Sequence, residues 1–123
     1  MGRVFLVVDD EPAVREVAAL MLEDLGCEVV TAANGSEALH RLAIDARIEA
    51  MITDINMPGM DGLTLLGEIK RRWPELPVMM VTAYGDDERR RRADEYGAAE
   101  FITKPVDFEM LKERLRQLPN GGE

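Results

Sequence analysis

The sequence predicts an α/β domain in which five parallel strands form one sheet between two layers of helices. The chain has 123 residues, which suits a single domain. Short apolar runs alternate five times with segments of helical periodicity. Because these runs are almost continuously apolar, they are typical of strands that are buried on both faces of a parallel sheet.

The first predicted strand, Val4–Val8, is wholly apolar and leads into a helix. Pro12 suits the first turn of this helix, and Gly26 suits its end. The apolar positions that repeat at helical spacing, and are therefore expected on its inner face, are Val14, Val17, Ala18, Met21, Leu22 and Leu25.

The second and third strands flank a helix with a recognisable start. Residues 27–32 are predicted to form the second strand. Asn34 and Glu37 have the spacing of a capping box, which predicts a helix from there to about Asp45. Residues 48–53 form the third strand, and the apolar run ends abruptly at Asp54.

The fourth strand is predicted at residues 78–82, after a loop bracketed by Pro74 and Pro77. Asp61 can cap the helix before that loop. The residues that this helix carries inward are Leu65, Leu66, Ile69 and Trp73.

The last part of the chain holds a polar helix, the fifth strand at residues 99–103 and a final helix. The polar helix opens at residues 85–87 and ends at Gly97. Its acid–arginine pairs, four residues apart with the acid first, are Asp86/Arg90, Asp87/Arg91 and Glu88/Arg92. Asp107 can cap the final helix, whose apolar face comprises Phe108, Leu111, Leu115 and Leu118.

The charge and composition exclude several classes of function. The net charge is −9, which disfavours nucleic acid as a direct partner because binding there depends on neutralising phosphates. A single cysteine, Cys27, cannot form an internal disulfide, and a reducing cytoplasm is the simple interpretation. No apolar run approaches the roughly 20 residues that a membrane span needs. Asp9 interrupts the first apolar run too early for a signal peptide.

Polar side chains stand where four of the five strands end. Asp9 and Asp10 follow the first strand, Asp54 the third, Thr82 the fourth and Lys104 the fifth, whereas the second strand contributes nothing obvious. Because functional sites of open parallel sheets form at the carboxyl ends of the strands, we expect these side chains to converge. Carboxylate oxygens suit Mg²⁺. Zinc is disfavoured, because no His or Cys lies near these positions. Asp54 would then be placed to attack phosphorus, with phosphoryl oxygens held by Mg²⁺, Thr82 and Lys104.

Each of these residues also has a plain structural explanation. Asp9 and Asp10 could be helix caps, Asp54 could end a strand, Thr82 is a favoured strand residue and Lys104 could be a solvated charge. Their coincidence at one edge of the sheet favours a functional site. The arginines of residues 89–92 are interpreted as a solvated helix face, because acids flank them.

The residues together resemble the receiver domain of bacterial two-component response regulators. The similarity extends from about residue 3 to residue 118, and the matching segments are Asp9-Asp10, Asp54, Met57-Pro58-Gly59-Met60-Asp61-Gly62, Thr82-Ala83 and Lys104-Pro105. The resemblance implies a flavodoxin-like fold, a three-layer (βα)5 sandwich with strand order 2-1-3-4-5. It also implies a receiver domain over residues 1–118 and a tail or linker start over residues 119–123.

The resemblance assigns a role to each site residue. It implies that Asp54 is the phosphoacceptor, with Thr82 and Lys104 contacting the phosphoryl group. It implies that Mg²⁺ is held by Asp9, Asp10, Asp54 and the backbone carbonyl of Asn56. Phe101 matches the switch aromatic, and the Lys104–Pro105 peptide is expected to be cis. Because Phe101 lacks a hydroxyl, its position is expected to depend on packing alone.

The predicted function is to accept a phosphoryl group on Asp54 and to switch an output surface. The donor would be a sensor histidine kinase or a histidine phosphotransfer protein, in the cytoplasm, and a homodimer could form through the fourth helix, fifth strand and fifth helix. The domain would catalyse only its own Mg²⁺-dependent phosphorylation and dephosphorylation, without binding nucleic acid or membrane. One alternative is a stand-alone phosphatase or phosphotransferase, which would need more chain for a substrate cap. The other is a receiver-like interaction module that never accepts phosphate, which the complete acidic set disfavours.

Overall fold

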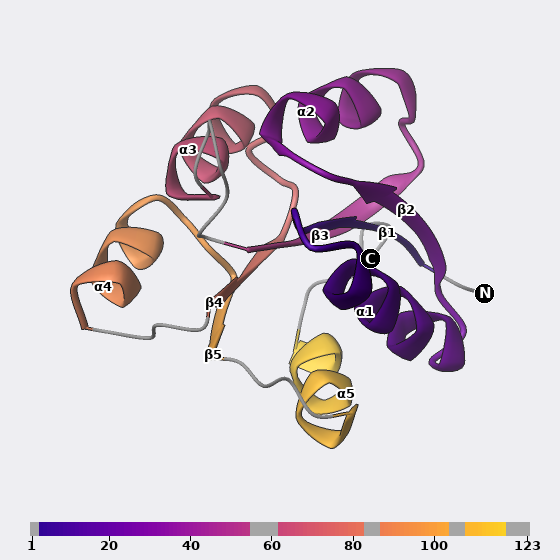
Figure 1. The fold of residues 1–123 in the computed structure, drawn as a ribbon. Helices are drawn as coiled ribbons and strands as arrows, with labels where there is room; N and C mark the ends of the chain where they lie inside the picture. Colours follow the sequence, from indigo (N-terminus) through magenta and orange to yellow (C-terminus); the bar gives the residue numbers. More distant parts are fainter. Residues whose placement is uncertain (1–2, 55–61, 83–86, 104–107, 118–123) are drawn as a thin grey trace.

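The computed structural model describes residues 3–54, 62–82, 87–103 and 108–117. Strands and helices alternate along the chain (Figure 1). The elements are β1 (Val4–Val8), α1 (Pro12–Asp24), β2 (Glu28–Ala32), α2 (Gly35–Ile44), β3 (Ile48–Asp54), α3 (Gly62–Arg72), β4 (Val78–Thr82), α4 (Asp87–Glu95), β5 (Glu100–Thr103) and α5 (Phe108–Gln117).

The five strands form one parallel sheet in the order β2-β1-β3-β4-β5, which confirms the predicted flavodoxin-like topology. Helices α2, α3 and α4 cover one face, and α1 and α5 cover the other (Figure 1). The central strand is therefore β3. Its last residue, Asp54, leaves the sheet between the ends of β1 and β4.

Two apolar layers sandwich the sheet, and successive residues of a strand contribute to different layers. Leu6 of β1 and Met80 of β4 belong to the layer beneath α2, α3 and α4. Phe5 and Met79 belong to the layer beneath α1 and α5. β1 and β4 are buried along their whole length, and β1 carries an apolar residue at every position and β4 at every position but the last. Such nearly continuous apolar runs are the pattern that predicted the parallel sheet.

Local sequence features set the ends of several helices as predicted. The side chain of Asn34 accepts a hydrogen bond from the backbone N–H of Glu37 at 2.8 Å, so Asn34 caps α2. Gly26 and Gly97 follow α1 and α4 with positive φ angles of 87° and 91°. Glycine adopts this left-handed conformation without steric cost, so both helices stop there.

The inner face of α1 is narrower than the sequence predicted. Val17 is 53% exposed, so its assignment to the apolar face was wrong, and Leu20 beside it is 57% exposed. Leu22 is the buried anchor of the helix, with Ala18 and Met21 packed against the same layer. At 3.6 residues per turn, Val17 lies well round the helix from Leu22 and faces away from the sheet.

Helix α3 agrees with the predicted packing. Leu65, Leu66 and Ile69 of α3 are buried, and Trp73 packs against the same layer from just beyond the helix. Met110 of α5 packs on the opposite layer. The predicted caps Asp61 and Asp107, and the side chains of Phe108, Leu111, Leu115 and Leu118, lie outside the described residues.

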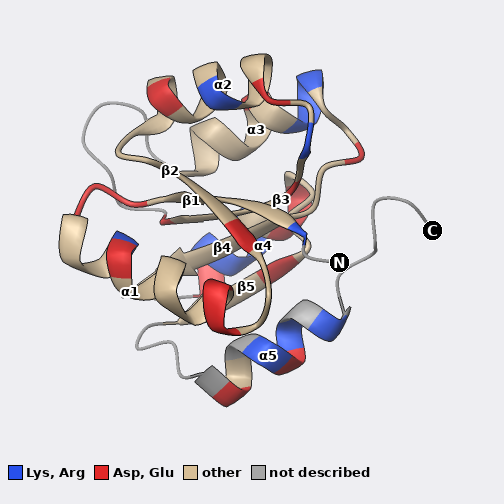
Figure 2. Cartoon of the chain, turned by 90° about the vertical axis from the view of Figure 1, so that its right-hand side faces the viewer, with Lys and Arg blue, Asp and Glu red and all other residues tan. Residues whose placement is uncertain are grey.

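Cys27 is half-buried against the layer beneath α1, where it packs as a small hydrophobic residue. Burial raises the pKa of its thiol. Acidic and basic residues lie side by side along α2 and α5 (Figure 2). Among the described residues, no helix is long and apolar enough to cross a bilayer.

Candidate functional site at the carboxyl edge of the sheet

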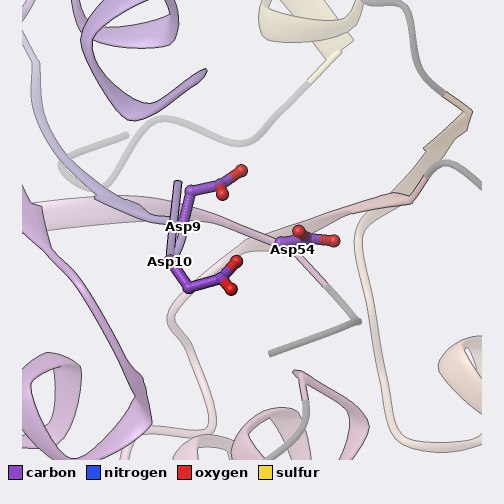
Figure 3. A group of neighbouring side chains, drawn as sticks. All are labelled: Asp9, Asp10 and Asp54. Atoms are coloured by element: carbon purple, nitrogen blue, oxygen red, sulfur yellow. The ribbon is translucent and has the colours of Figure 1, made fainter. Parts of the chain in front are cut away.

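Three carboxylates from two neighbouring strands meet at the carboxyl edge of the sheet (Figure 3). Asp9 and Asp10 follow β1, and Asp54 is the last residue of β3. One oxygen from each carboxylate lies within 4.8 Å of the others. β1 and β3 pair in parallel, with Val8 opposite Thr53, so residues that follow these strands are brought together by the register of the sheet.

The carboxylates are close enough to repel one another strongly when all three are ionised. Asp9 and Asp54 are buried, at 5% and 6% exposure, and Asp10 is more exposed. Burial lowers the local dielectric and therefore strengthens the repulsion. A cation shared among the carboxylates would relieve it. Oxygen donors alone, with no His or Cys in the cluster, suit a hard ion such as Mg²⁺.

Hydrogen bonds made by Asp9 fix the turn that carries Asp9 and Asp10. The backbone N–H of Asp9 donates to the carbonyl of Ala32 at 3.2 Å, so β2 supports the backbone of the site although it adds no site side chain. A carboxylate oxygen of Asp9 accepts the backbone N–H of Glu11 at 3.0 Å. Glu11 is the N-cap residue of α1 and no described side chain caps this helix, so the alternative in which Asp9 is a helix cap is not supported. The Arg15 guanidinium donates from α1 to the Asp9 carbonyl at 2.7 Å.

The end of β3 is held by the residue before the candidate phosphoacceptor. The hydroxyl of Thr53, which is fully buried, donates to the backbone carbonyl of Asp54 at 3.1 Å. A side chain that bonds to its neighbour's backbone in this way constrains the strand where it leaves the sheet. The hydrogen bond therefore restricts the backbone that carries the Asp54 carboxylate.

Thr82 ends β4 at the same edge of the sheet. It is fully buried, and in the strand register Val81 pairs with Asp54 while Thr82 pairs with Thr103. The predicted position of Thr82 beside the acidic cluster thus agrees with the pairing of β3, β4 and β5.

Phe101 lies on β5, opposite Met80 of β4, and is only 6% exposed. The guanidinium carbon of Arg90 lies 4.9 Å from the centroid of the Phe101 ring. This contact corrects one expectation, because the ring has an electrostatic partner in addition to its packing. Arg90 is exposed, as predicted for a solvated helix face, and contacts the ring from there.

Four of the predicted assignments cannot be compared with the structure. Lys104, Pro105 and the carbonyl of Asn56 lie outside the described residues, as does Asp86, the predicted partner of Arg90. Their roles stay predictions.

The sequence contained weak signals for the supporting residues that were missed. Arg15 places a positive charge near the N-terminus of a helix, where the helix dipole disfavours it, and this suggests a specific partner. Arg90 is exposed and comes one turn before Ala93, the buried residue of α4, so it borders the side of the helix that packs on the sheet. Nothing local predicted the Ala32 carbonyl, since it meets Asp9 only through the pairing of β1 with β2.

Comparison with known sequences finds matches over nearly the whole chain. A family model described as the response regulator receiver domain matches residues 5–116. The response regulator protein FleR of Pseudomonas aeruginosa is 40% identical over 128 residues, covering 100% of this chain and 27% of FleR. The DNA-binding transcriptional regulator NtrC of Escherichia coli K12 is 41% identical over 103 residues, covering 84% of this chain and 22% of NtrC. The chain therefore spans about a quarter of the length of these relatives.

Comparison with solved structures finds the same fold. The chemotaxis protein CheY4 of Vibrio cholerae superposes with a TM-score of 0.90 at 30% identity, covering 97% of this chain and 100% of CheY4. The response regulator protein TrrA of Thermotoga maritima, solved in complex with Mg²⁺-BeF, has a TM-score of 0.86 at 36% identity. That match covers 95% of this chain and 99% of TrrA.

Proposed function

The chain belongs to the response regulator receiver domain family, and from this premise we propose that Asp54 is its phosphoacceptor. Receiver domains act as phosphoacceptors in two-component signalling and are phosphorylated by histidine kinases. The observation that carries the assignment to Asp54 is its position. Asp54 ends the central strand, with its carboxylate in the acidic cluster and Thr82 at the end of the adjacent strand.

The acidic cluster fits a Mg²⁺ ion. Asp9, Asp10 and Asp54 would provide carboxylate oxygens, and the family resemblance suggests the Asn56 carbonyl as a further ligand. When bound, the ion would neutralise charge on the phosphoryl oxygens. The similar chain TrrA was solved in complex with Mg²⁺-BeF, which supports Mg²⁺ as the ion that this domain binds.

The chain's own residues would promote transfer mainly by positioning and charge. A carboxylate oxygen of Asp54 attacks phosphorus, and the bond from phosphorus to the donor's imidazole nitrogen breaks as the new P–O bond forms. The Thr82 hydroxyl and the Lys104 ammonium hold the phosphoryl oxygens. A receiver domain is not a catalytic enzyme in the usual sense. The catalysis we propose is limited to Mg²⁺-dependent phosphorylation and dephosphorylation of Asp54 itself.

We further propose how the domain passes on its signal. Residues 1–118 act as the receiver domain in the cytoplasm, with residues 119–123 as a tail or linker start. Phosphorylation alters the face formed by α4, β5 and α5, through which the domain forms a homodimer or contacts an effector. The relatives FleR and NtrC are several times longer, and NtrC is a DNA-binding transcriptional regulator, so this domain could regulate a similar output.

Phosphorylation by a small acyl phosphate tests the assignment of Asp54. The wild-type protein is incubated with acetyl phosphate and Mg²⁺, and the modified residue is mapped by mass spectrometry. We expect one modified residue, Asp54, and no modification without Mg²⁺. Glu23→Gln serves as the control for loss of one carboxylate, since Glu23 is exposed near the end of α1 and lies outside the acidic cluster. Modification of Asp54→Asn at the wild-type level would show that the acceptor lies elsewhere, whereas an unmodified wild type would favour the interaction module.

A further inference from the structure

We infer that Arg90 positions Phe101, and that the charge of its guanidinium holds the ring in the buried position. Two features of the fold suggest this role. The Phe101 ring is 6% exposed, and the guanidinium carbon of Arg90 lies 4.9 Å from its centroid. A cation within about 6 Å of a ring face is attracted by the negative face of the π-system.

The surroundings place Phe101 between α4 and the sheet. It belongs to the apolar layer that also contains Met80 of β4 and Ala93 of α4. Arg90 lies one turn before Ala93 and is itself exposed, so its charged group covers the ring from the solvent side. The contact joins α4 to β5 directly.

The contact matters for switching only if it differs between two positions of the ring. If the Phe101 ring left its buried position between α4 and the sheet, its stacking on Arg90 would break. The contact would then stabilise the buried position alone. An interaction made in one of two states shifts their populations by its full free energy. This step rests on the proposed function, and it adds that a phosphoryl group on Asp54 draws the Thr82 hydroxyl toward it and thereby favours the buried ring.

Linkage then predicts the effect of Arg90 on ligand binding. If the buried ring and the bound phosphoryl mimic favour each other, loss of the contact weakens binding of the mimic. A partly exposed cation–π contact corresponds to a change of about two- to fivefold. Arg90 would thus increase the affinity of the domain for the phosphoryl mimic, without contacting the phosphoryl group.

The first experiment measures the ring in the protein without phosphate. Fluorophenylalanine is incorporated site-specifically at position 101, and its ¹⁹F resonance is recorded for the wild type, Arg90→Met, Arg90→Lys and Arg91→Met. Arg91 is exposed on the same helix and provides a matched control. We expect Arg90→Met to move the resonance toward that of an exposed ring, Arg90→Lys to restore it in part, and Arg91→Met to leave it unchanged. Equal resonances in Arg90→Met and the wild type would overturn the inference.

The second experiment separates charge from packing and measures the coupling. Beryllofluoride is titrated in the presence of Mg²⁺, and we expect Arg90→Met to bind about two- to fivefold more weakly than Arg91→Met. Replacing Phe101 by pentafluorophenylalanine removes the negative ring face, and should abolish the difference between arginine and methionine at position 90. Equal affinities of the two methionine variants would overturn the coupling, as would a difference that persists with the fluorinated ring. A wild type that binds no beryllofluoride would overturn the proposed function as well, while the ring resonances would still report on the contact itself.

Discussion

At the scale of single residues, the site places like charges together and fixes the backbone that carries them. Asp9, Asp10 and Asp54 approach within 4.8 Å of one another, and two of the three are buried. Thr53 and Arg15 donate to the backbone carbonyls of Asp54 and Asp9. The hydrogen bonds offset part of the repulsion by making alternative backbone positions less favourable. The repulsion therefore lowers the stability of the metal-free protein, and binding of a cation is expected to raise it.

Asp10→Asn should raise the thermal stability of the metal-free protein and remove most of its response to Mg²⁺. The substitution deletes one of three repelling charges, which is expected to stabilise by on the order of 1 kcal/mol. In the wild type, Mg²⁺ at a hundredfold excess over its Kd should stabilise by about 2.7 kcal/mol. Thermal melts in EDTA and in Mg²⁺ measure both effects. A variant that melts lower than the wild type in EDTA and responds normally to Mg²⁺ would contradict the metal assignment.

Arg15→Met should destabilise the domain by roughly 1–3 kcal/mol, since it removes a charge-assisted hydrogen bond to the Asp9 carbonyl while keeping the aliphatic stem. The loss also frees the turn before α1, so the affinity for Mg²⁺ should fall even though a nearby positive charge has gone. Urea unfolding and calorimetric titration of Mg²⁺ measure the two quantities, with Arg91→Met as the control. A rise in Mg²⁺ affinity would mean that Arg15 acts by its charge and not by holding the turn.

At the scale of secondary-structure elements, side chains that cross between elements hold the outer helices in place. Arg114 of α5 pairs with Glu100 of β5 at 2.8 Å, which joins the last helix to the edge strand. Lys70 near the end of α3 donates to the carbonyl of Leu76 at 2.5 Å, just before β4. Its aliphatic stem lies beside Gly97, where a Cβ atom would come within 3.6 Å of it. Lys70 therefore connects α3, the approach to β4 and the end of α4.

Lys70→Met should change how the free energy of unfolding depends on pH in the alkaline range. Burial of the ammonium lowers the pKa of Lys70 below its ordinary value of 10.5. Between the folded pKa and 10.5 the unfolded chain binds more protons, so Lys70 makes the wild type gain stability as pH rises through that window. Below the folded pKa the cost of burying the charge is fully present. Unfolding free energies of the wild type and Lys70→Met across this range test the idea. A difference between them that does not vary with pH would refute it.

At the scale of the whole molecule, the parallel sheet connects the site with the face formed by α4, β5 and α5, which we propose as the output surface. β4 carries Thr82 at the site edge, and Met80 of the same strand pairs with Phe101 of β5. Arg90 then connects Phe101 to α4. A change at Asp54 can thus reach α4 through adjacent strands, without any movement of α1 or α2.

Beryllofluoride with Mg²⁺ should therefore change hydrogen exchange in α4 and β5 and alter self-association of the domain. Thr82→Ala should still accept phosphate on Asp54, but the change in α4 and β5 should become weaker, because the hydroxyl that follows the phosphoryl group is absent. Exchange monitored by mass spectrometry and sedimentation of both proteins give the two readouts. Identical exchange in α4 and β5 with and without the mimic would exclude this route.

The sequence alone determined the alternation of strands and helices, because the signals for it are local. Continuous apolar runs, the Asn34 cap and Gly26 and Gly97 act within a few residues, and each had the predicted effect in the fold. Their order also placed Asp9, Asp10, Asp54 and Thr82 at strand ends, and a parallel sheet brings strand ends to one edge. Boundaries shifted only slightly, with β2 and β5 each starting one residue later than predicted.

The tertiary structure decided which distant groups meet, because these contacts depend on the register and twist of the sheet and on where each helix packs. The Ala32 carbonyl supports Asp9 only because β2 pairs with β1, and Arg90 covers Phe101 only because α4 packs beside β5. The exposure of Val17 was decided in the same way, by how far α1 is rotated against the sheet. Periodicity shows that a helix has an apolar face, whereas the width of the face that is buried depends on what packs against it.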